Sequence, residues 1–200
     1  ESYMTYMRHL CIPGSSTGNK NISKVRPGEY VTFSKSGEIK TYKYWDPFSF
    51  EIDYEMSESD ASDELERLLI ESVEYRKVSD VEVGLFLSGG LDSSLIGKLM
   101  KAGSQSKLKG FNIDYEEHFD GYKGEVSEAE YASSNIDIEL IKEKIAYRDF
   151  KTLLNNYSNY QDDLNGDEVG IPLYFLGKSA RSKGITVVQV GEGADELFYG

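Results

Sequence analysis

Residues 81–94 read Val-Glu-Val-Gly-Leu-Phe-Leu-Ser-Gly-Gly-Leu-Asp-Ser-Ser. The first seven form a nearly continuous apolar run, which is typical of a strand buried on both faces of a sheet. A serine- and glycine-rich loop follows directly, and after it apolar residues recur at helical spacing from Leu95 to Met100. The pattern predicts a buried strand, a glycine loop and a helix that ends at Gly103.

The same alternation of strand and helix continues along the chain. Before the glycine loop, apolar residues from Ala61 to Val73 fall on one helical face, with Ser59 or Asp60 as the expected N-cap. Such alternation predicts an α/β fold in which a parallel sheet carries helices on both faces. The further expected strands are 108–113, 136–141 and 185–190, and the further expected helices are 127–134, 148–157 and 171–183.

The first part of the chain has a different pattern of apolar and turn-forming residues. From Tyr3 to Tyr44 it reads as turns and short strands, which indicates hairpin-rich β structure. An acidic, weakly patterned linker follows before the helical period begins. The strands are expected at 30–33 and 39–45 and the linker at 48–59, which divides the chain into regions of residues 1–55 and 56–200.

Composition argues against several classes of protein. The chain has 22 Lys and Arg against 35 Asp and Glu, a net charge of -13 that repels phosphate backbones and anionic lipid. Its mean hydropathy of -0.48 is that of an ordinary globular protein. No run approaches the roughly 20 apolar residues of a membrane span. We therefore expect neither a nucleic-acid partner nor a membrane.

The single cysteine and the two ends of the chain suggest a compartment and an origin. Cys11 alone excludes an intrachain disulfide, and residues 1–4 lack the regions of a signal peptide, so we expect a reducing cytoplasm. We expect Cys11 itself to be a buried structural thiol. The chain starts without an initiator methionine and stops at Gly200 just after a motif-like run, so we expect it to be part of a longer protein.

The loop of residues 88–94 has the features of an anion site. A loop between a buried strand and a helix amino terminus presents unpaired N–H groups and the positive end of the helix dipole. Gly89 and Gly90 let the backbone close around an oxyanion, and serine hydroxyls add donors. The loop lacks the lysine of a P-loop and carries Asp92 instead. A carboxylate beside a phosphate site is reasonable with Mg²⁺ between them. A plain strand-to-helix turn of small residues is the structural alternative.

A second loop places three carboxylates just past another expected strand. Residues 190–198 read Val-Gly-Glu-Gly-Ala-Asp-Glu-Leu-Phe, with Glu192, Asp195 and Glu196 close together. The crowding is self-repelling unless a metal-bound polyphosphate supplies countercharge, or one carboxylate serves as a general base near an incoming amine. The structural alternative is an acidic first helical turn that complements the helix dipole.

These residues resemble the glutamine-dependent asparagine synthetases and their amide-forming relatives. Residues 88–94 are similar to that family's pyrophosphate-binding loop, and residues 191–198 to its second active-site signature. Two specific motifs in the right order make a chance agreement improbable. The resemblance continues at residues 13–14, 25–29 and 44–46, which are similar to the end of the family's glutaminase domain, and at 79–84, 162–163, 167, 171–174 and 179–181.

The resemblance implies a fold and a reaction. The fold is the PP-loop, adenine nucleotide α-hydrolase-like α/β fold, preceded by a β-rich remnant of an N-terminal-nucleophile glutaminase domain. The reaction is that of a ligase: a carboxylate, by default aspartate, attacks the α-phosphate of ATP, pyrophosphate leaves, and ammonia from glutamine converts the acyl-adenylate into an amide. It is also compatible with a homodimer.

The resemblance also implies roles for single residues. Glu192 would act at the adenylate, assisting its formation or accepting a proton from ammonia. Asp92 and Asp195 would coordinate Mg²⁺. Pyrophosphate would be held by Ser88, Gly89, Gly90, Asp92, Ser93 and Ser94. The adenosine site would be lined by Leu87, Ile113, Val190 and Gly191.

Departures from the family's pattern put the subfamily in question. Gln189-Val190 replaces the more usual hydrophobic-serine pair, and Leu164 stands where a proline is common. The family's nucleophilic cysteine and catalytic lysine are not found in residues 1–200, so we expect this chain by itself to have neither glutaminase nor synthetase activity.

Three alternatives stay open. The acceptor could be another carboxylate: a β-lactam precursor, a peptide side chain or a sugar acid. The chain could be an inactive ATP-binding module, although such a module would be free to lose the carboxylates of Asp92, Glu192 and Asp195 that repel one another when the site is empty. An ATP pyrophosphatase of sulfur chemistry would want cysteines near the loop, and none are there.

The remaining polar and aromatic features suggest no site. His9 and His118 have no Cys or His partners at ligand spacing, so we expect surface or packing roles. Trp45 and the tyrosines at 157 and 160 could stack on a base, but aromatic residues near strands and helices are usually core, so we expect them there.

Overall fold

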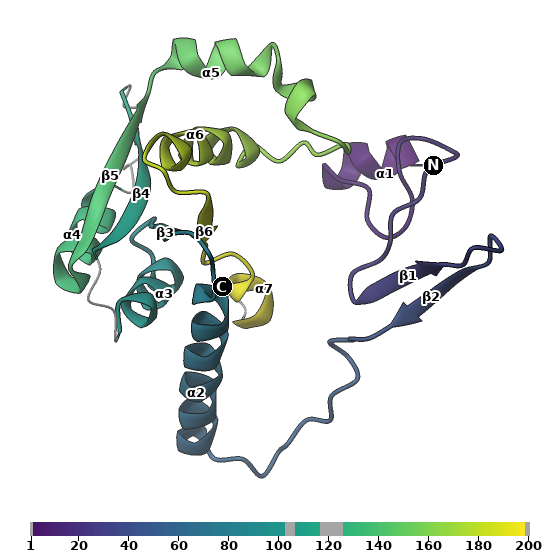
Figure 1. Cartoon of the computed structure of the whole chain (residues 1–200), viewed down its shortest axis with the longest axis horizontal. Coiled ribbons are helices and arrows are strands. Elements are labelled where there is room, and N and C mark those ends of the chain that lie inside the picture. Colours follow the sequence, from purple (N-terminus) through teal and green to yellow (C-terminus); the bar gives the residue numbers. More distant parts are fainter. Residues whose placement is uncertain (1, 103–106, 117–125, 199–200) are drawn as a thin grey trace. The chain divides into compact units, whose positions relative to one another are not determined.

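The computed structural model describes residues 2–102, 107–116 and 126–198, which form two compact units (Figure 1). Glu1–Met56 and Asn156–Glu168 make up the first, called here the amino-terminal unit. Ser57–Asn155 and Val169–Gly200 make up the second, called here the sheet unit. The amino-terminal unit thus includes a short segment that the sequence places between two parts of the sheet unit.

Four parallel strands form the sheet unit's centre, in the order β5-β4-β3-β6 (Figure 1). β3 (Val83–Phe86) lies between β4 (Leu108–Tyr115) and β6 (Val187–Gln189). β4 pairs along its whole length with β5 (Ile138–Ile145) at one side of the sheet. The predicted parallel sheet is confirmed, and its centre is the strand predicted within residues 81–87.

Helices cover both faces of this sheet, as predicted. On one face, α2 (Glu58–Lys77), α3 (Leu91–Lys101) and α4 (Val126–Ile136) pack around Leu85 and Leu87, which are 0% and 1% exposed. On the other face, α6 (Gly170–Ser182) packs around Phe111 and Ile185, which are both 1% exposed. Side chains alternate between the faces of a strand, so a run that is apolar at every position fills both cores. α5 (Tyr147–Leu154) precedes α6 and contacts it.

Some element boundaries differ from the prediction. α2 has Ser57 as its N-cap, not Ser59 or Asp60, because the Ser57 hydroxyl accepts the N–H of Asp60. β5 begins at Ile138 because Ile136 completes α4 and Asp137 turns the chain with a φ of 61°. The helix expected at 148–157 ends at Leu154, and a separate 3-10 turn (η1) spans Tyr157–Tyr160. The expected stop at Gly103 lies outside the described residues.

The apolar face of α2 contributes less to the core than its pattern suggests. Val73 is buried, whereas Leu65 and Leu68 are 38% and 47% exposed. The period correctly predicts the helix, but the described residues cover only its carboxyl-terminal half.

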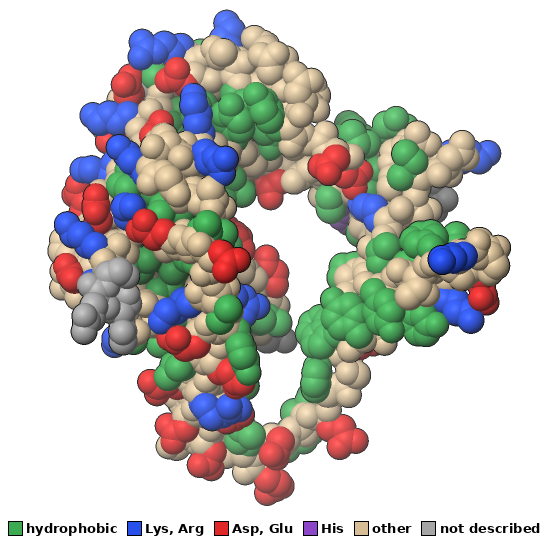
Figure 2. Space-filling view, viewed as in Figure 1, with side chains coloured by type: hydrophobic (Ala, Val, Ile, Leu, Met, Phe, Trp, Pro, Cys, Tyr) green, Lys and Arg blue, Asp and Glu red, His purple; other side chains and the backbone are tan. Residues whose placement is uncertain are grey.

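The amino-terminal unit contains the predicted hairpin. β1 (Glu29–Phe33) pairs antiparallel with β2 (Ile39–Lys43), and the rings of Tyr30 and Tyr42 stack with centroids 5.0 Å apart. Hydrophobic side chains are exposed over both strands (Figure 2). Ile12 is buried at 3%, and it is the single residue of this unit, among those described, in that class.

Three expectations for this unit are wrong. Residues 3–9, expected as turns and strands, lie in helix α1 (Ser2–His9), which has no glycine or proline and places Arg8 and His9 at the favourable carboxyl end. Cys11 is exposed rather than buried, because it lies on a short β-bridge to Asn165 at the surface. Trp45 and Tyr160 are also exposed, at 47% and 56%.

Across the described ranges of the chain, none of the helices has the length and apolar character needed to cross a membrane.

Candidate functional site

Two glycine-rich loops meet at the carboxyl edge of the sheet. β3 and β6 are parallel neighbours with Leu85 opposite Gln189, so both strands end at the same edge. The first loop leaves β3 for α3, and the second leaves β6 for the short helix α7 (Ala194–Phe198). A Cβ on Gly191 would lie 3.1 Å from the Ser93 nitrogen and 3.2 Å from the Asp92 Cβ. The two motifs are therefore in contact, at the edge where parallel sheets bind ligands.

Gly89 packs the first loop against the start of α4. Its φ of 92° is a conformation that residues with a side chain rarely adopt. A Cβ on Gly89 would also lie 2.3 Å from the carbonyl carbon of Glu128 and 2.4 Å from the nitrogen of Ala129. The backbone of α4 thus supports the loop from behind, which only glycine permits.

The amino end of α3 keeps its N–H groups open. Gly90 is the N-cap, and no side chain caps the helix. The Ser88 hydroxyl instead accepts the N–H of Gly90 at 3.2 Å and shares a 2.9 Å hydrogen bond with the Ser93 hydroxyl. The Ser94 hydroxyl oxygen is buried and has no hydrogen-bond partner among the described residues. Open N–H groups, a free hydroxyl and a helix dipole together suit an anion such as phosphate.

Asn112 fixes the point at which the loop begins. It is 4% exposed, and its amide nitrogen donates to the carbonyl oxygen of Leu87 at 2.9 Å. The N–H of Leu87 donates in turn to the carbonyl of Phe111 at 2.9 Å. The amide oxygen of Asn112 has no partner among the described residues. Leu87, the residue that directly follows β3, is thus held by both of its main-chain groups just before Ser88.

The three carboxylates expected to act lie around these loops. Asp92 is half-buried in the first turn of α3, while Glu192 and Asp195 are exposed beyond β6. Within the described residues, no three or more His, Cys, Asp or Glu side chains gather as a metal site. Mg²⁺ commonly takes only one or two carboxylates and completes its shell with water and substrate phosphates. The donor set therefore fits Mg²⁺ only together with a phosphate ligand.

The four residues expected around adenosine differ in their burial and in their contacts with the two loops. The Leu87 side chain belongs to the core, so any contact with a nucleoside would come from its main chain. Ile113 is half-buried on β4, next to Asn112, and Val190 is 37% exposed directly after β6. The described contacts join Gly191 to the first loop but do not extend to Ile113.

Sequence reasoning missed two supports of this site. Asn112 stands in an apolar strand, and a polar residue in such a run is a signal that could have been noticed. The backbone of Glu128 and Ala129 behind Gly89 carries no signal of its own in the sequence, because any residue could supply it.

Comparison with known proteins adds a family match. Residues 64–200 match the family model described as asparagine synthase. The whole chain is 36% identical to Asparagine synthetase [glutamine-hydrolyzing] 1 of Bacillus subtilis, and it covers 30% of that protein. It is 27% identical, over 93% of its length, to Amidase chry2 of Gibberella zeae and covers 30% of that protein. The chain thus spans about a third of the length of these relatives.

Similarity at a low level also extends to solved structures, of which one is described here. It is the NH3-dependent NAD synthetase from Campylobacter jejuni in complex with the nitrate ion. The TM-score is 0.45 at 19% identity, covering 69% of this chain and 60% of that one.

Proposed function

Since the chain belongs to the asparagine synthase family, we propose that its sheet unit binds ATP and activates a carboxylate for conversion into an amide. The observation that carries the proposal is the contact of Gly191 with Asp92 and Ser93, which assembles the two family motifs at one edge of the sheet. A degenerate binding module would have no need to keep acidic residues on both sides of that contact.

The proposed reaction assigns the chain's own residues to successive tasks. The N–H groups and hydroxyls of the first loop, from Ser88 to Ser94, hold the leaving pyrophosphate. The carboxylate oxygen of the acceptor attacks the α-phosphorus, and the bond from that phosphorus to pyrophosphate breaks. Ammonia then adds to the acyl carbon, AMP leaves, and Glu192 takes the proton that the nitrogen loses. The adenosine would lie against Leu87, Ile113, Val190 and Gly191.

Two carboxylates would hold the metal ion. Asp92 starts α3 and Asp195 starts α7, so each approaches the loop contact from one motif. Bound Mg²⁺ would neutralise the charge that develops on the departing pyrophosphate.

The amino-terminal unit is proposed to be the end of a glutaminase domain. Residues 1–55 carry the resemblance to that domain, and the Bacillus subtilis relative is named as glutamine-hydrolyzing. Ammonia would then come from glutamine, and the full-length protein would be a cytoplasmic, homodimeric ligase. Aspartate is the proposed acceptor. The similarity to an amidase from Gibberella zeae is the specific reason to test other carboxylates beside it.

The test is ATP/pyrophosphate exchange by the full-length protein with aspartate and Mg²⁺. Asp92→Asn and Asp195→Asn should each abolish exchange while the far-ultraviolet circular dichroism stays that of the wild type, because each removes charge from the metal site. Asp137→Asn is the matched control, since Asp137 is an exposed carboxylate before β5, at the opposite edge of the sheet. Exchange at the wild-type rate in either of the first two variants would remove the metal assignment. Exchange that responds to another carboxylate but not to aspartate would change the acceptor.

A further inference from the structure

Residues 161–167 form a short segment that is called here the strap. In the sequence it lies between α5 and α6 of the sheet unit, yet it packs within the amino-terminal unit. The N–H of Gly166 donates to the carbonyl of Leu10 at 2.7 Å, and Asn165 forms an antiparallel bridge with Cys11. The strap thus adds a strand-like edge to residues 10–11.

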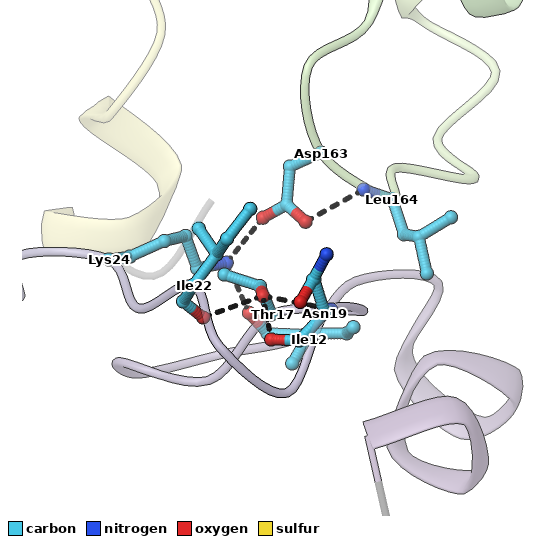
Figure 3. Close-up of polar contacts among 7 residues, drawn as sticks. All are labelled: Ile12, Thr17, Asn19, Ile22, Lys24, Asp163 and Leu164. Atoms are coloured by element: carbon cyan, nitrogen blue, oxygen red, sulfur yellow. Dashed lines mark hydrogen bonds and ion pairs between the residues drawn. The ribbon is translucent and has the colours of Figure 1, made fainter.

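An ion pair fixes the strap to the amino-terminal unit (Figure 3). The ammonium of Lys24 donates to Asp163 Oδ2 at 2.5 Å and to the carbonyl of Ile12 at 2.6 Å. The other oxygen of Asp163 accepts the N–H of Leu164 at 2.8 Å. Lys24 holds the pKa of Asp163 below its ordinary value, with the Leu164 N–H acting in the same direction. The pair therefore binds the strap to the unit's one buried residue among those described, Ile12.

Close packing surrounds this pair. A Cβ on Gly166 would lie 3.0 Å from the hydroxyl of Tyr6 and 3.2 Å from Leu10. A Cβ on Gly18 would lie 3.1 Å from the Leu164 side chain. Leu164 is the residue that stands where a proline is common in the family that the chain resembles. Close packing therefore holds the strap in place together with the ion pair.

The strap continues directly into the elements that carry the second loop. It leads into α6, whose Ile171 and Phe175 are buried against the sheet unit. The end of α6 is tied to the segment that precedes β6 by the N–H of Ile185, which donates to the carbonyl of Ala180 at 3.0 Å. β6 and the loop of Glu192 follow at once. The strap is therefore joined along the chain to the helix and the strand that lead to the loop of Glu192.

We propose that the strap couples the two activities of the enzyme, with Lys24 and Asp163 as positioning residues that keep glutamine hydrolysis in step with amide formation. The proposal rests on the proposed function. Neither residue lies among those assigned to the nucleotide, so their effect is on coupling and not on the chemistry of the adenylate.

The experiment measures the two ammonia sources separately in the full-length protein. Amide formation is followed with glutamine and with ammonium as donor, beside glutamate release. Asp163→Asn and Lys24→Ala should lower the glutamine-dependent rate about tenfold relative to the ammonium-dependent rate, the size of a modest coupling between sites. Glutamate released per amide formed should rise. Lys24→Arg, which keeps the charge, should restore much of the coupling.

A matched pair of variants controls for charge. Lys43 and Asp46 form an ion pair elsewhere in the same unit, and their side-chain hydrogen bonds among the described residues do not include one to the strap. Lys43→Ala and Asp46→Asn should leave the ratio of the two rates unchanged. Hydrogen exchange should become faster at Gly166 in Asp163→Asn and stay unchanged in β4.

The outcomes separate the two proposals. A wild-type protein that forms no amide from ammonium would overturn the proposed function itself. An active wild type whose Asp163→Asn variant loses both rates equally, or neither, would show that the strap is only a structural contact, and the coupling role would be withdrawn.

Discussion

Gly89 is held by two separate requirements, a left-handed backbone and the absence of a side chain. Its φ is 92°, and a Cβ would lie 2.3 Å from the carbonyl carbon of Glu128. Gly184 has a similar φ of 80° but no heavy atom within 4 Å of the corresponding Cβ position. The two glycines therefore separate backbone strain from overpacking.

We predict that Gly89→Ala destabilises the sheet unit clearly more than Gly184→Ala does. Both changes carry the strain of a left-handed residue, roughly 1–2 kcal/mol. Gly89→Ala adds the displacement of a helix backbone, a further cost of about 1–3 kcal/mol. Urea unfolding followed by circular dichroism would measure the difference. Equal losses would mean that α4 does not press on the loop.

Glu192 can be tested as a catalytic group because the structure gives it no structural partner. Its side chain is exposed and makes no hydrogen bond within the described residues. We predict that Glu192→Gln leaves ATP affinity of the full-length protein within about 1 kcal/mol of the wild type, since no ground-state contact is lost. Amide formation should fall by roughly 10²-fold or more, the usual contribution of a positioned acid or base.

The matched control is Glu139→Gln on the exposed side of β5, which should change neither quantity. Equal small losses of affinity and of rate in Glu192→Gln would instead indicate a residue that only stabilises the following helix, and its catalytic assignment would be withdrawn.

At the level of elements, the start of α2 shows which serine caps the helix. The Ser57 hydroxyl accepts the N–H of Asp60 at 3.1 Å and donates to the Asp60 carboxylate at 2.7 Å. We predict that Ser57→Ala costs the first turn of α2 about 1 kcal/mol, which corresponds to about a fivefold faster amide exchange at Asp60. Ser59→Ala should leave that exchange unchanged, because Ser59 lies within the helix. The reverse result would restore Ser59 as the cap.

Elements with a strong period could be predicted from the sequence, and elements fixed by distant contacts could not. The apolar run before Ser88 has the composition of a central strand, and β3 is that strand. Helix α1 has no buried residue, so no apolar face announces it. Cys11 has apolar neighbours in the sequence but lies on a surface bridge to Asn165. Burial of a single residue depends on such partners, which composition does not reveal.

The candidate site followed the same rule. The glycines and carboxylates of both loops could be recognised because their spacing is a local property. Their contact through Gly191 required the order of the strands, since β3 and β6 are far apart in the sequence and adjacent in the sheet. Asn112 could have been noticed as a polar residue in an apolar strand, but its role could not be assigned, because that role depends on the register that places it beside Leu87.

For the whole molecule, the strap is the feature that the sequence does not reveal. The change of texture near residue 55 lies beside the end of Glu1–Met56, but nothing local indicates that Asn156–Glu168 packs with that unit. The ion pair between Lys24 and Asp163 could not be predicted either, because many other residues of opposite charge in this chain could form a pair with each of them. The identity of residues 1–55 as the end of a glutaminase domain stays a prediction.

Limited proteolysis of this chain would test that division. Phe48, Phe50 and Tyr54 are 93%, 68% and 84% exposed and lie outside helices and strands, so among the described residues we predict that chymotrypsin cuts here first. Tyr131 is equally exposed, but helix α4 protects its backbone. The nicked chain should stay together on native gel filtration, because the strap remains on the larger fragment and holds the smaller one.

Asp163→Asn should release the amino-terminal fragment from the nicked chain, since it removes the charge that Lys24 binds while leaving the cut site untouched. The variant of the exposed pair, Asp46→Asn, serves as the control and should leave the fragments associated, because the hydrogen bond from Gly166 to Leu10 and the Lys24 pair are both intact. Immediate separation of the wild-type fragments would show that residues 156–168 do not hold the amino-terminal unit, and the strap would then have no means of carrying a signal to α6.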